Sequence, residues 1–225
     1  MNKLEILYED NHIIVVVKPV NILSQADSTN DIDMLTLVKD YIKKKYNKPG
    51  NVYLGLVHRL DRPVGGVMVF AKTSKAASRL SDQVRTHILK KTYIAVVTGL
   101  FEKKEGILKN YIVKQNDNSS VISVNKEGKY SELTYEVLEE NIKEKLSLVK
   151  VNLKTGRHHQ IRVQFANIGH YLYGDQRYGV QDKNQIALYA YKLEFTHPVK
   201  KETMVFKKPP EENGIWKVFK SVKQL

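Results

Sequence analysis

Residues 91–97 read KTYIAVV and open the stretch that decides the fold. From Lys91 to Leu153, apolar side chains recur at every second position, which is the period of a strand with one buried face. Short polar turns separate these segments, so the pattern predicts an antiparallel meander. Its strands are expected at residues 93–97, 106–113, 121–124, 131–138 and 146–153.

Further strands and three helices are predicted on both sides of the meander. Strands are expected at residues 5–8, 13–17, 53–57, 67–71 and 187–195, followed by a closing hairpin and a C-terminal helix with Trp216. Helical spacing is found at residues 31–46, 74–87 and 157–168, with Leu80 and Ile88 facing inward in the second helix. Asp31 or Asp33 would cap the first helix and Thr155 the third. The result is an α+β fold, with a mainly antiparallel sheet and residues 1–225 in one domain.

The charge balance points to a polyanionic partner. The 225 residues carry 37 Lys and Arg against 24 Asp and Glu, a formal net charge of +13. Such a chain attracts polyanions at long range, and RNA is the most common one inside cells. The chain has no cysteine, which excludes disulfides, thiol catalysis and cysteine zinc sites. No signal peptide or membrane-length apolar run is visible, so a cytoplasmic protein is expected.

A carboxylate between two arginines is the first candidate for chemistry. Residues 57–72 read VHRLDRPVGGVMVFAK, which places Asp61 in a loop between two predicted strands, with Arg59 and Arg62 beside it. The arginines would favour ionised Asp61, and an ionised aspartate in a cleft can act as a nucleophile or a base. The alternative is an ion pair that only holds the loop together, and this segment alone leaves both interpretations open.

A second basic segment follows the meander. Residues 153–164 read LKTGRHHQIRVQ, so a helix capped by Thr155 would carry Arg157 and Arg162. Arginine suits bidentate recognition of phosphate or carboxylate, although a solvated basic helix end has the same pattern. His158 and His159 would diverge by about 100° on a helix, and no carboxylate or cysteine completes a ligand set, so no metal site is expected.

Tyr93 near the start of a predicted strand also admits two interpretations. Such a tyrosine often packs in a core, but in an RNA enzyme it could stack on a base or move a proton. The sequence contains no nucleotide-binding glycine loop, zinc helix motif or nucleophile elbow, so no cofactor is expected.

Taken together, these segments resemble the RluA-type pseudouridine synthase family. The family's central motif stands here as His58-Arg59-Leu60-Asp61, continues through Gly66 and ends at Ala71-Lys72. Tyr93 matches the family's tyrosine strand, and residues 155–162 match its third motif. Further matches lie at residues 7–10, 17–19, 169–170, 174–175 and 193–198, in the family's order.

The resemblance implies an enzyme that converts uridine to pseudouridine in structured RNA, ribosomal or transfer RNA, without a cofactor. It implies that Asp61 is the essential carboxylate, that Tyr93 stacks on the target base and helps to move the C5 proton, and that Arg162 pairs with Asp61. Unpaired uridines would be flipped at the least cost, with Arg59 filling the vacated stack. Other RNA contacts would come from Arg62, Lys72, Arg157, His159 and Gln160. A monomer that binds neither DNA nor membrane is expected.

Three departures from the family pattern affect these expectations. Val64-Gly65-Gly66 stands where the family usually has a Thr-Ser-Gly turn, so a hydroxyl contact is lost. Gln164 stands where family members often carry histidine, which is expected to alter an RNA contact. No N-terminal S4-like RNA-binding module is expected, which would assign the choice of RNA to the catalytic domain.

The basic residues concentrate in the segments that carry the motifs. Residues 58–91 hold eight Lys and Arg against two Asp, and residues 141–165 hold six against one Glu. Two other functions remain open. A non-catalytic RNA-binding module is favoured by Val64-Gly65-Gly66, whereas a glycosidase or nuclease would need a second carboxylate that neither motif contains.

Overall fold

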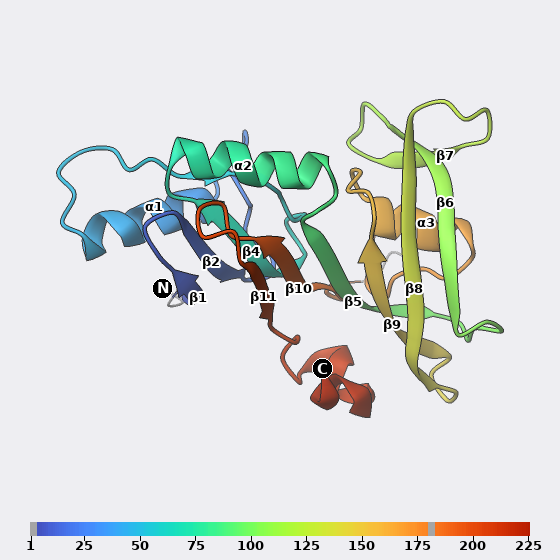
Figure 1. Cartoon of the computed structure of the whole chain (residues 1–225). Helices are drawn as coiled ribbons and strands as arrows, with labels where there is room; N and C mark the ends of the chain where they lie inside the picture. Colours follow the sequence, from blue (N-terminus) through green and yellow to red (C-terminus); the bar gives the residue numbers. More distant parts are fainter. Residues whose placement is uncertain (1–3, 180–182) are drawn as a thin grey trace. The chain divides into compact units, whose positions relative to one another are not determined.

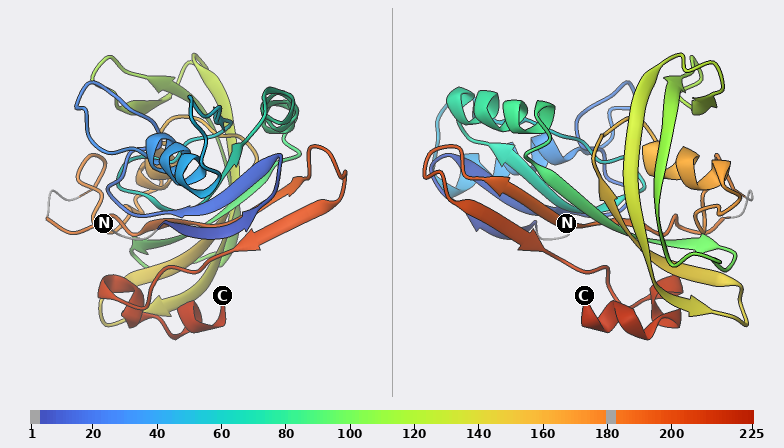
Figure 2. Two further views of the ribbon diagram at one scale, coloured as in Figure 1. Left: turned by 90° about the vertical axis from the view of Figure 1, so that its left-hand side faces the viewer. Right: turned by 45° about the vertical axis from the view of Figure 1, so that its right-hand side comes forward.

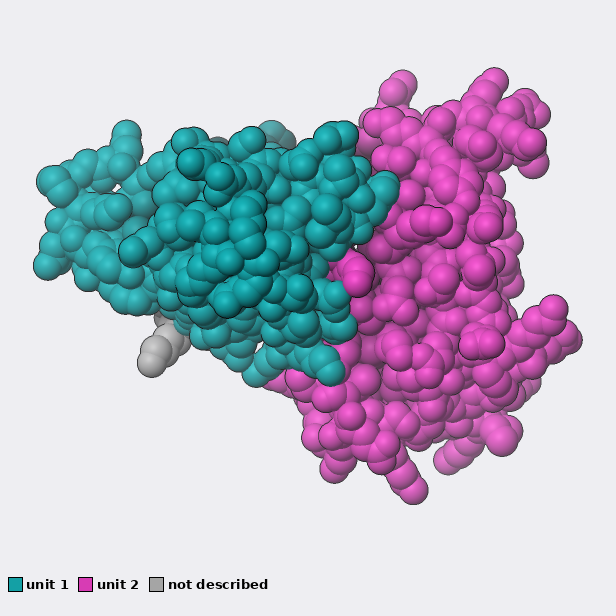
Figure 3. Space-filling view, viewed as in Figure 1, with its two compact units in different colours: residues 1–89, 192–208 teal, residues 90–191, 209–225 magenta. Residues whose placement is uncertain are grey.

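The order of elements is that of an α+β protein (Figure 1), and the pairs β1–β2, β2–β4 and β5–β9 are antiparallel. The structure is a computed structural model that describes residues 4–179 and 183–225. The chain divides into two compact units (Figure 3): unit 1 comprises residues 1–89 and 192–208, and unit 2 comprises residues 90–191 and 209–225. The expectation of one domain over residues 1–225 stays a prediction.

Unit 1 is built on strands that are apolar on both faces. Its strand order is β1-β2-β4-β10, with β3 paired to β4 and β11 paired to β10. In β2 and β4 every residue is buried, because these central strands are covered on both sides. The elements are β1 Glu5–Glu9, β2 Ile13–Lys18, α1 Met34–Lys45, β3 Gly55–Leu56, β4 Gly65–Ala71, α2 Ser74–Arg85, the end of β10 Leu188–Thr196, and β11 Thr203–Lys207.

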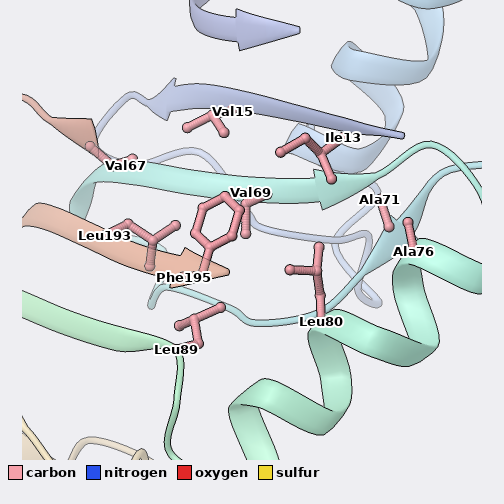
Figure 4. Packing of buried hydrophobic residues seen from close by; sticks show 10 residues of the cluster. All are labelled: Ile13, Val15, Val67, Val69, Ala71, Ala76, Leu80, Leu89, Leu193 and Phe195. Carbon is pink, nitrogen blue, oxygen red and sulfur yellow. The ribbon is translucent and has the colours of Figure 1, made fainter. Parts of the chain in front are cut away.

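The core of unit 1 fills the space between its strands and α2. Figure 4 shows Val15, Val69 and Phe195 of the strands in one cluster with Leu80 of α2. All four side chains are at most 1% exposed. Fully burying a side chain of this size contributes roughly 1.5–3 kcal/mol, so this cluster holds β4 and the loop before it in place.

Both helices of unit 1 begin at the capping residues their sequences favour. The side chain of Asp33, one of the two predicted caps, accepts a hydrogen bond from Thr36 N at 3.0 Å. Thr73 caps α2 through Ala76 N. The predicted inward position of Ile88 was wrong: α2 ends at Arg85, and Ile88 is 50% exposed.

The predicted meander forms unit 2. Its strand order is β5-β9-β8-β6-β7, and Figure 2 shows these strands in green to yellow with α3 beside them. Tyr93 pairs with Val151 between β5 and β9. The elements are β5 Lys90–Thr98, β6 Glu105–Lys114, β7 Ser120–Ser123, β8 Lys129–Asn141, β9 Leu146–Leu153, α3 Gln160–Asn167, and the 3-10 helices η1 Gly214–Val218 and η2 Lys220–Gln224.

The C-terminal part of unit 2 differs from the predicted helices. Ile94 and Val96 of β5 pack with Phe219 and Val222, which lie in and between the two 3-10 helices rather than in an α-helix. The third helix begins at Gln160 instead of residue 157. The reason is His159, whose φ of 52° is left-handed and incompatible with a continuous helix.

No helix in the described ranges has the length and apolarity that a membrane span requires.

Candidate active site

The loop that carries Asp61 is anchored on both sides of the carboxylate. Ser24 is buried, and its hydroxyl accepts from Leu60 N at 3.0 Å and donates to Leu60 O at 2.7 Å. After the carboxylate, Val64 N donates to Asp61 O at 3.0 Å and closes a turn. Buried His58 accepts at Nε2 from Val69 N at 3.1 Å and ties the loop to β4. Asp61 is therefore a half-buried carboxylate on a fixed backbone, with Arg59 exposed beside it.

A buried ammonium lies beneath this loop, and the sequence analysis gave it no role. Lys18 at the end of β2 is 0% exposed, and its Nζ donates to Arg62 O and to Pro19 O, each at 3.0 Å. Burial lowers the pKa of Lys18 to about 7, although the negative charge of Asp61 acts in the opposite direction. Lys18 thus joins β2 to the Asp61 loop and titrates near neutral pH.

Arg62 takes part in a different ion pair from the one the sequence suggested. Its guanidinium lies 2.7 Å from Asp31, and both side chains are about half exposed. Gly66, which the family's Thr-Ser-Gly turn shares, has a φ of 128°, and nothing in the structure explains the departures at Val64 and Gly65. Side-chain-bearing residues rarely adopt that conformation, so a glycine is needed at this point of β4.

Lys72 lies at the other end of β4 from Asp61, roughly 20 Å along the strand. Its Nζ is 2.6 Å from both Glu9 Oε1 and Asp10 O, and its side chain is only 10% exposed. Burial alone would raise the pKa of Glu9, but hydrogen bonds from Lys45, Lys72 and Tyr46 lower it to about 2. These contacts give Lys72 a structural function and leave its predicted RNA contact without support.

The arginine of the second motif is held by a buried carboxylate. Arg162 on α3 donates through Nε and Nη2 to the two oxygens of Asp175, at 2.9 and 2.7 Å. Their side chains are 9% and 1% exposed. Burial would raise the pKa of Asp175, but the Arg162 guanidinium outweighs it and lowers the pKa. A bidentate pair of this kind fixes the guanidinium plane.

A hydrogen-bonded network surrounds this ion pair in unit 2. The Tyr178 ring lies 5.2 Å from the Arg162 guanidinium carbon, and its hydroxyl accepts from Ser120 N at 2.7 Å. The same hydroxyl is 2.8 Å from Nδ1 of His159. Burial, together with the charge of Arg162, lowers the pKa of His159 to about 3, so its imidazole is neutral at pH 7.

The other residues of the second motif shape the turn before α3. Thr155, the predicted cap, instead accepts from Glu132 N at 2.9 Å and donates to the Gln160 side chain at 2.8 Å. Gln160 is 3% exposed and also accepts from Arg157 N, so it holds the turn and is poorly placed for an RNA contact. Arg157 precedes the helix and donates to Tyr130 O. The rings of His158 and His159 stack 3.8 Å apart instead of diverging, because His159 is left-handed.

Gln164 is fully buried rather than exposed to a partner. Its amide donates to Asn110 Oδ1 at 2.7 Å and to Leu108 O at 3.2 Å. The expectation that this position alters an RNA contact therefore has no support, and Gln164 ties α3 to β6.

The structure thus groups the predicted residues by unit. Unit 1 positions Asp61, Arg59 and Arg62 on one loop, and unit 2 positions Tyr93 on β5 and Arg162 on α3. The sequence analysis missed the supporting roles of Lys18, Ser24, Asp175, Tyr178 and Ser120, because they depend on contacts between distant segments. Within the described ranges, no group of three or more metal-ligating side chains is found.

Comparison with known proteins extends these observations. Residues 12–167 match the sequence model of a family described as RNA pseudouridylate synthase. An uncharacterised RNA pseudouridine synthase of Bacillus subtilis is 36% identical over 210 residues, which cover 92% of this chain and 68% of the relative. Ribosomal large subunit pseudouridine synthase C of Buchnera aphidicola is 33% identical over 208 residues, 86% of this chain and 63% of the relative.

A solved structure has the same fold. Human RNA Pseudouridylate Synthase Domain Containing 4 aligns with a TM-score of 0.75 at 20% sequence identity, covering 91% of this chain and 87% of that one.

Proposed function

The chain belongs to the RNA pseudouridylate synthase family of isomerases, and we propose that it modifies ribosomal RNA with Asp61 as the essential carboxylate. The observation that carries this proposal is the fixed Asp61 loop. The Ser24 hydroxyl accepts from Leu60 N and donates to Leu60 O, which holds the residue before Asp61, and Lys18 donates to the carbonyl of the residue after it. A loop backbone held on both sides of Asp61 supports a pre-organised carboxylate, whereas a surface ion pair would not need this support.

The reaction rearranges one glycosidic bond and needs no redox partner. The bond between N1 of uracil and C1′ of ribose breaks, the base turns, and a bond from C5 to C1′ forms. The proton on C5 is lost, and N1 gains one. Asp61 would act on the ribose or the base, and Tyr93 would stack on the uracil and help to move the C5 proton.

Arg162 would complete the site by pairing with Asp61. Asp175 already orients the guanidinium through Nε and Nη2. An arginine held by a buried carboxylate can orient a second carboxylate without losing its own geometry.

We propose large-subunit ribosomal RNA as the substrate. Several relatives carry that substrate in their names, including ribosomal large subunit pseudouridine synthase D of Nitrosomonas europaea, 32% identical over 218 residues. Exposed Arg59 and half-exposed Arg62 would contact RNA beside Asp61, with Arg157 and His159 contributing from unit 2. The net charge of +13 supports association with a polyanion.

A tritium-release assay tests the proposal. The protein is incubated with large-subunit ribosomal RNA and, separately, with transfer RNA, both transcribed with tritium at uridine C5. Release from the ribosomal transcript is expected, because C5 loses its proton when the new bond forms. Release from transfer RNA alone would refute the proposed substrate. Binding of RNA with no release from either pool would favour the non-catalytic binding module.

A further inference from the structure

The structure contains a lysine beside Tyr93 that the reaction as described does not use. Lys91 and Tyr93 are two residues apart on β5, so their side chains point to the same face of the strand. Ile94 and Val96 point to the opposite face and enter the core of unit 2. Lys91 therefore lies on the side of β5 where the proposed base-stacking tyrosine works.

The ammonium of Lys91 reaches the turn of the second motif. A Cβ added at Gly156 would lie 2.9 Å from Lys91 Nζ, so the absence of a side chain at Gly156 makes room for the ammonium. Arg157 follows Gly156 in the chain, and its Nε donates to Tyr130 O. The backbone of this turn is fixed, because the Gln160 side chain accepts hydrogen bonds from the Thr155 hydroxyl and from Arg157 N.

Lys91 lacks the acidic partner that a half-buried lysine usually has. Throughout residues 4–179 and 183–225, no carboxylate forms an ion pair with Lys91 and no hydrogen bond to its Nζ is found. Burial lowers the pKa of Lys91, since nothing nearby compensates for the lost hydration. Other lysines of unit 2 do have such partners: Lys150 is paired with Glu136, and Lys154 with Glu132.

We propose that Lys91 binds an RNA backbone phosphate next to the base that stacks on Tyr93. A phosphate would supply the negative charge that the protein does not, in a turn where glycine allows close approach. Lysine serves as a point charge for phosphate, so it needs no bidentate geometry. This inference rests on the proposed function, because it takes Tyr93 as the place of the target base.

Salt-dependent binding tests the proposal. The probe is an in vitro transcript of large-subunit ribosomal RNA, bound to full-length protein that also carries Asp61→Asn so that turnover does not interfere. Lys91→Met is expected to weaken binding about tenfold and to reduce the slope of log K against log salt by roughly 0.7–0.9, the contribution of one phosphate contact. The control is Lys90→Met, which removes the same charge one residue earlier on the opposite face of β5 and should leave the slope unchanged.

Two further variants test whether the effect depends on where the Lys91 ammonium lies and whether it comes from a loss of folding. Gly156→Ala keeps every charge but displaces the Lys91 ammonium, so it is expected to weaken binding in the same direction. Lys91→Gln replaces Lys91→Met if the latter unfolds, as monitored by thermal denaturation. A Lys91 variant that is folded and has the wild-type slope would overturn the proposal, as would equal effects of the Lys90 and Lys91 variants. This test measures RNA binding and the test of the proposed function measures tritium release. Absence of tritium release from wild type would therefore refute the proposed function but would leave the Lys91 binding result unaffected.

Discussion

Replacing Asp175 by asparagine tests how much the buried ion pair contributes to stability and activity. The substitution keeps the shape and one acceptor oxygen for the backbone N–H groups of Arg177 and Tyr178, which now donate to Asp175 Oδ1. It removes the charge that faces Arg162, in a pair whose side chains are 9% and 1% exposed. Breaking a buried pair by removing one partner typically costs 3–5 kcal/mol, because the other charge stays buried.

We expect the Asp175→Asn variant to lose about 3 kcal/mol of unfolding free energy, the lower end of that range, since asparagine retains part of the hydrogen bonding. A domain with 5–15 kcal/mol of stability would remain folded after this loss, so activity can still be measured. The rate of tritium release should fall about 100-fold, because Arg162 would no longer be held in one orientation.

Urea unfolding of wild type and variant at pH 7 measures the stability change through the denaturation midpoint at a constant m-value. Asp117→Asn is the matched control, because Asp117 faces Arg177 at 3.9 Å with both side chains exposed, and it should change little. A loss below about 1 kcal/mol for Asp175→Asn, together with unchanged tritium release, would refute the reasoning about this pair.

Three further substitutions probe other buried polar groups. The pKa of Lys18 is about 7 in the folded protein and near 10.4 in the unfolded chain, so the free energy of unfolding of wild type should rise with pH between these values. Lys18→Met should lack this rise when urea unfolding is measured between pH 7 and 9. The ionised form of Glu9 stabilises the fold above pH 4.5, and this contribution is lost as pH falls toward 2, so Glu9→Gln should show a weaker acid dependence across that window. Tyr178→Phe leaves Ser120 N without its acceptor and should lower the free energy of unfolding by about 1–3 kcal/mol in the same assay. An unchanged free energy of unfolding would mean that water replaces the hydroxyl as the acceptor.

The elements that the sequence predicted best are those with a strict period and a local signal. The strand at residues 146–153 matches β9 to the residue, because apolar side chains alternate at 146 and 148 and again at 149, 151 and 153. Asp33 as a cap was predictable, since its hydrogen bond to Thr36 lies within one turn. The start of α3 was predicted wrongly, because the left-handed backbone of His159 is stabilised by Tyr178, nineteen residues away in sequence.

The residues of the candidate site also fall into those that the sequence predicts and those that only the folded structure reveals. Asp61, Tyr93 and Arg162 are predicted from ordered motifs and stay predictions, whereas the residues that support them in the fold could not be predicted. Ser24 reaches Leu60 across 36 residues, and Lys18 reaches Arg62 across 44, so only the folded chain reveals them. Lys72 and Gln160 were predicted to contact RNA, and the structure shows that both also hold parts of the protein together, so their RNA contacts stay predictions.

The most direct test of the central claim compares wild type with Asp61→Asn on tritium-labelled large-subunit ribosomal RNA. The control is Asp31→Asn, which removes the exposed partner of Arg62 and leaves the Asp61 carboxylate in place. Wild type and the control are expected to release tritium at similar rates, and Asp61→Asn is expected to release none while still binding the RNA. Release by Asp61→Asn at the wild-type rate would contradict the assignment of Asp61 as the essential carboxylate.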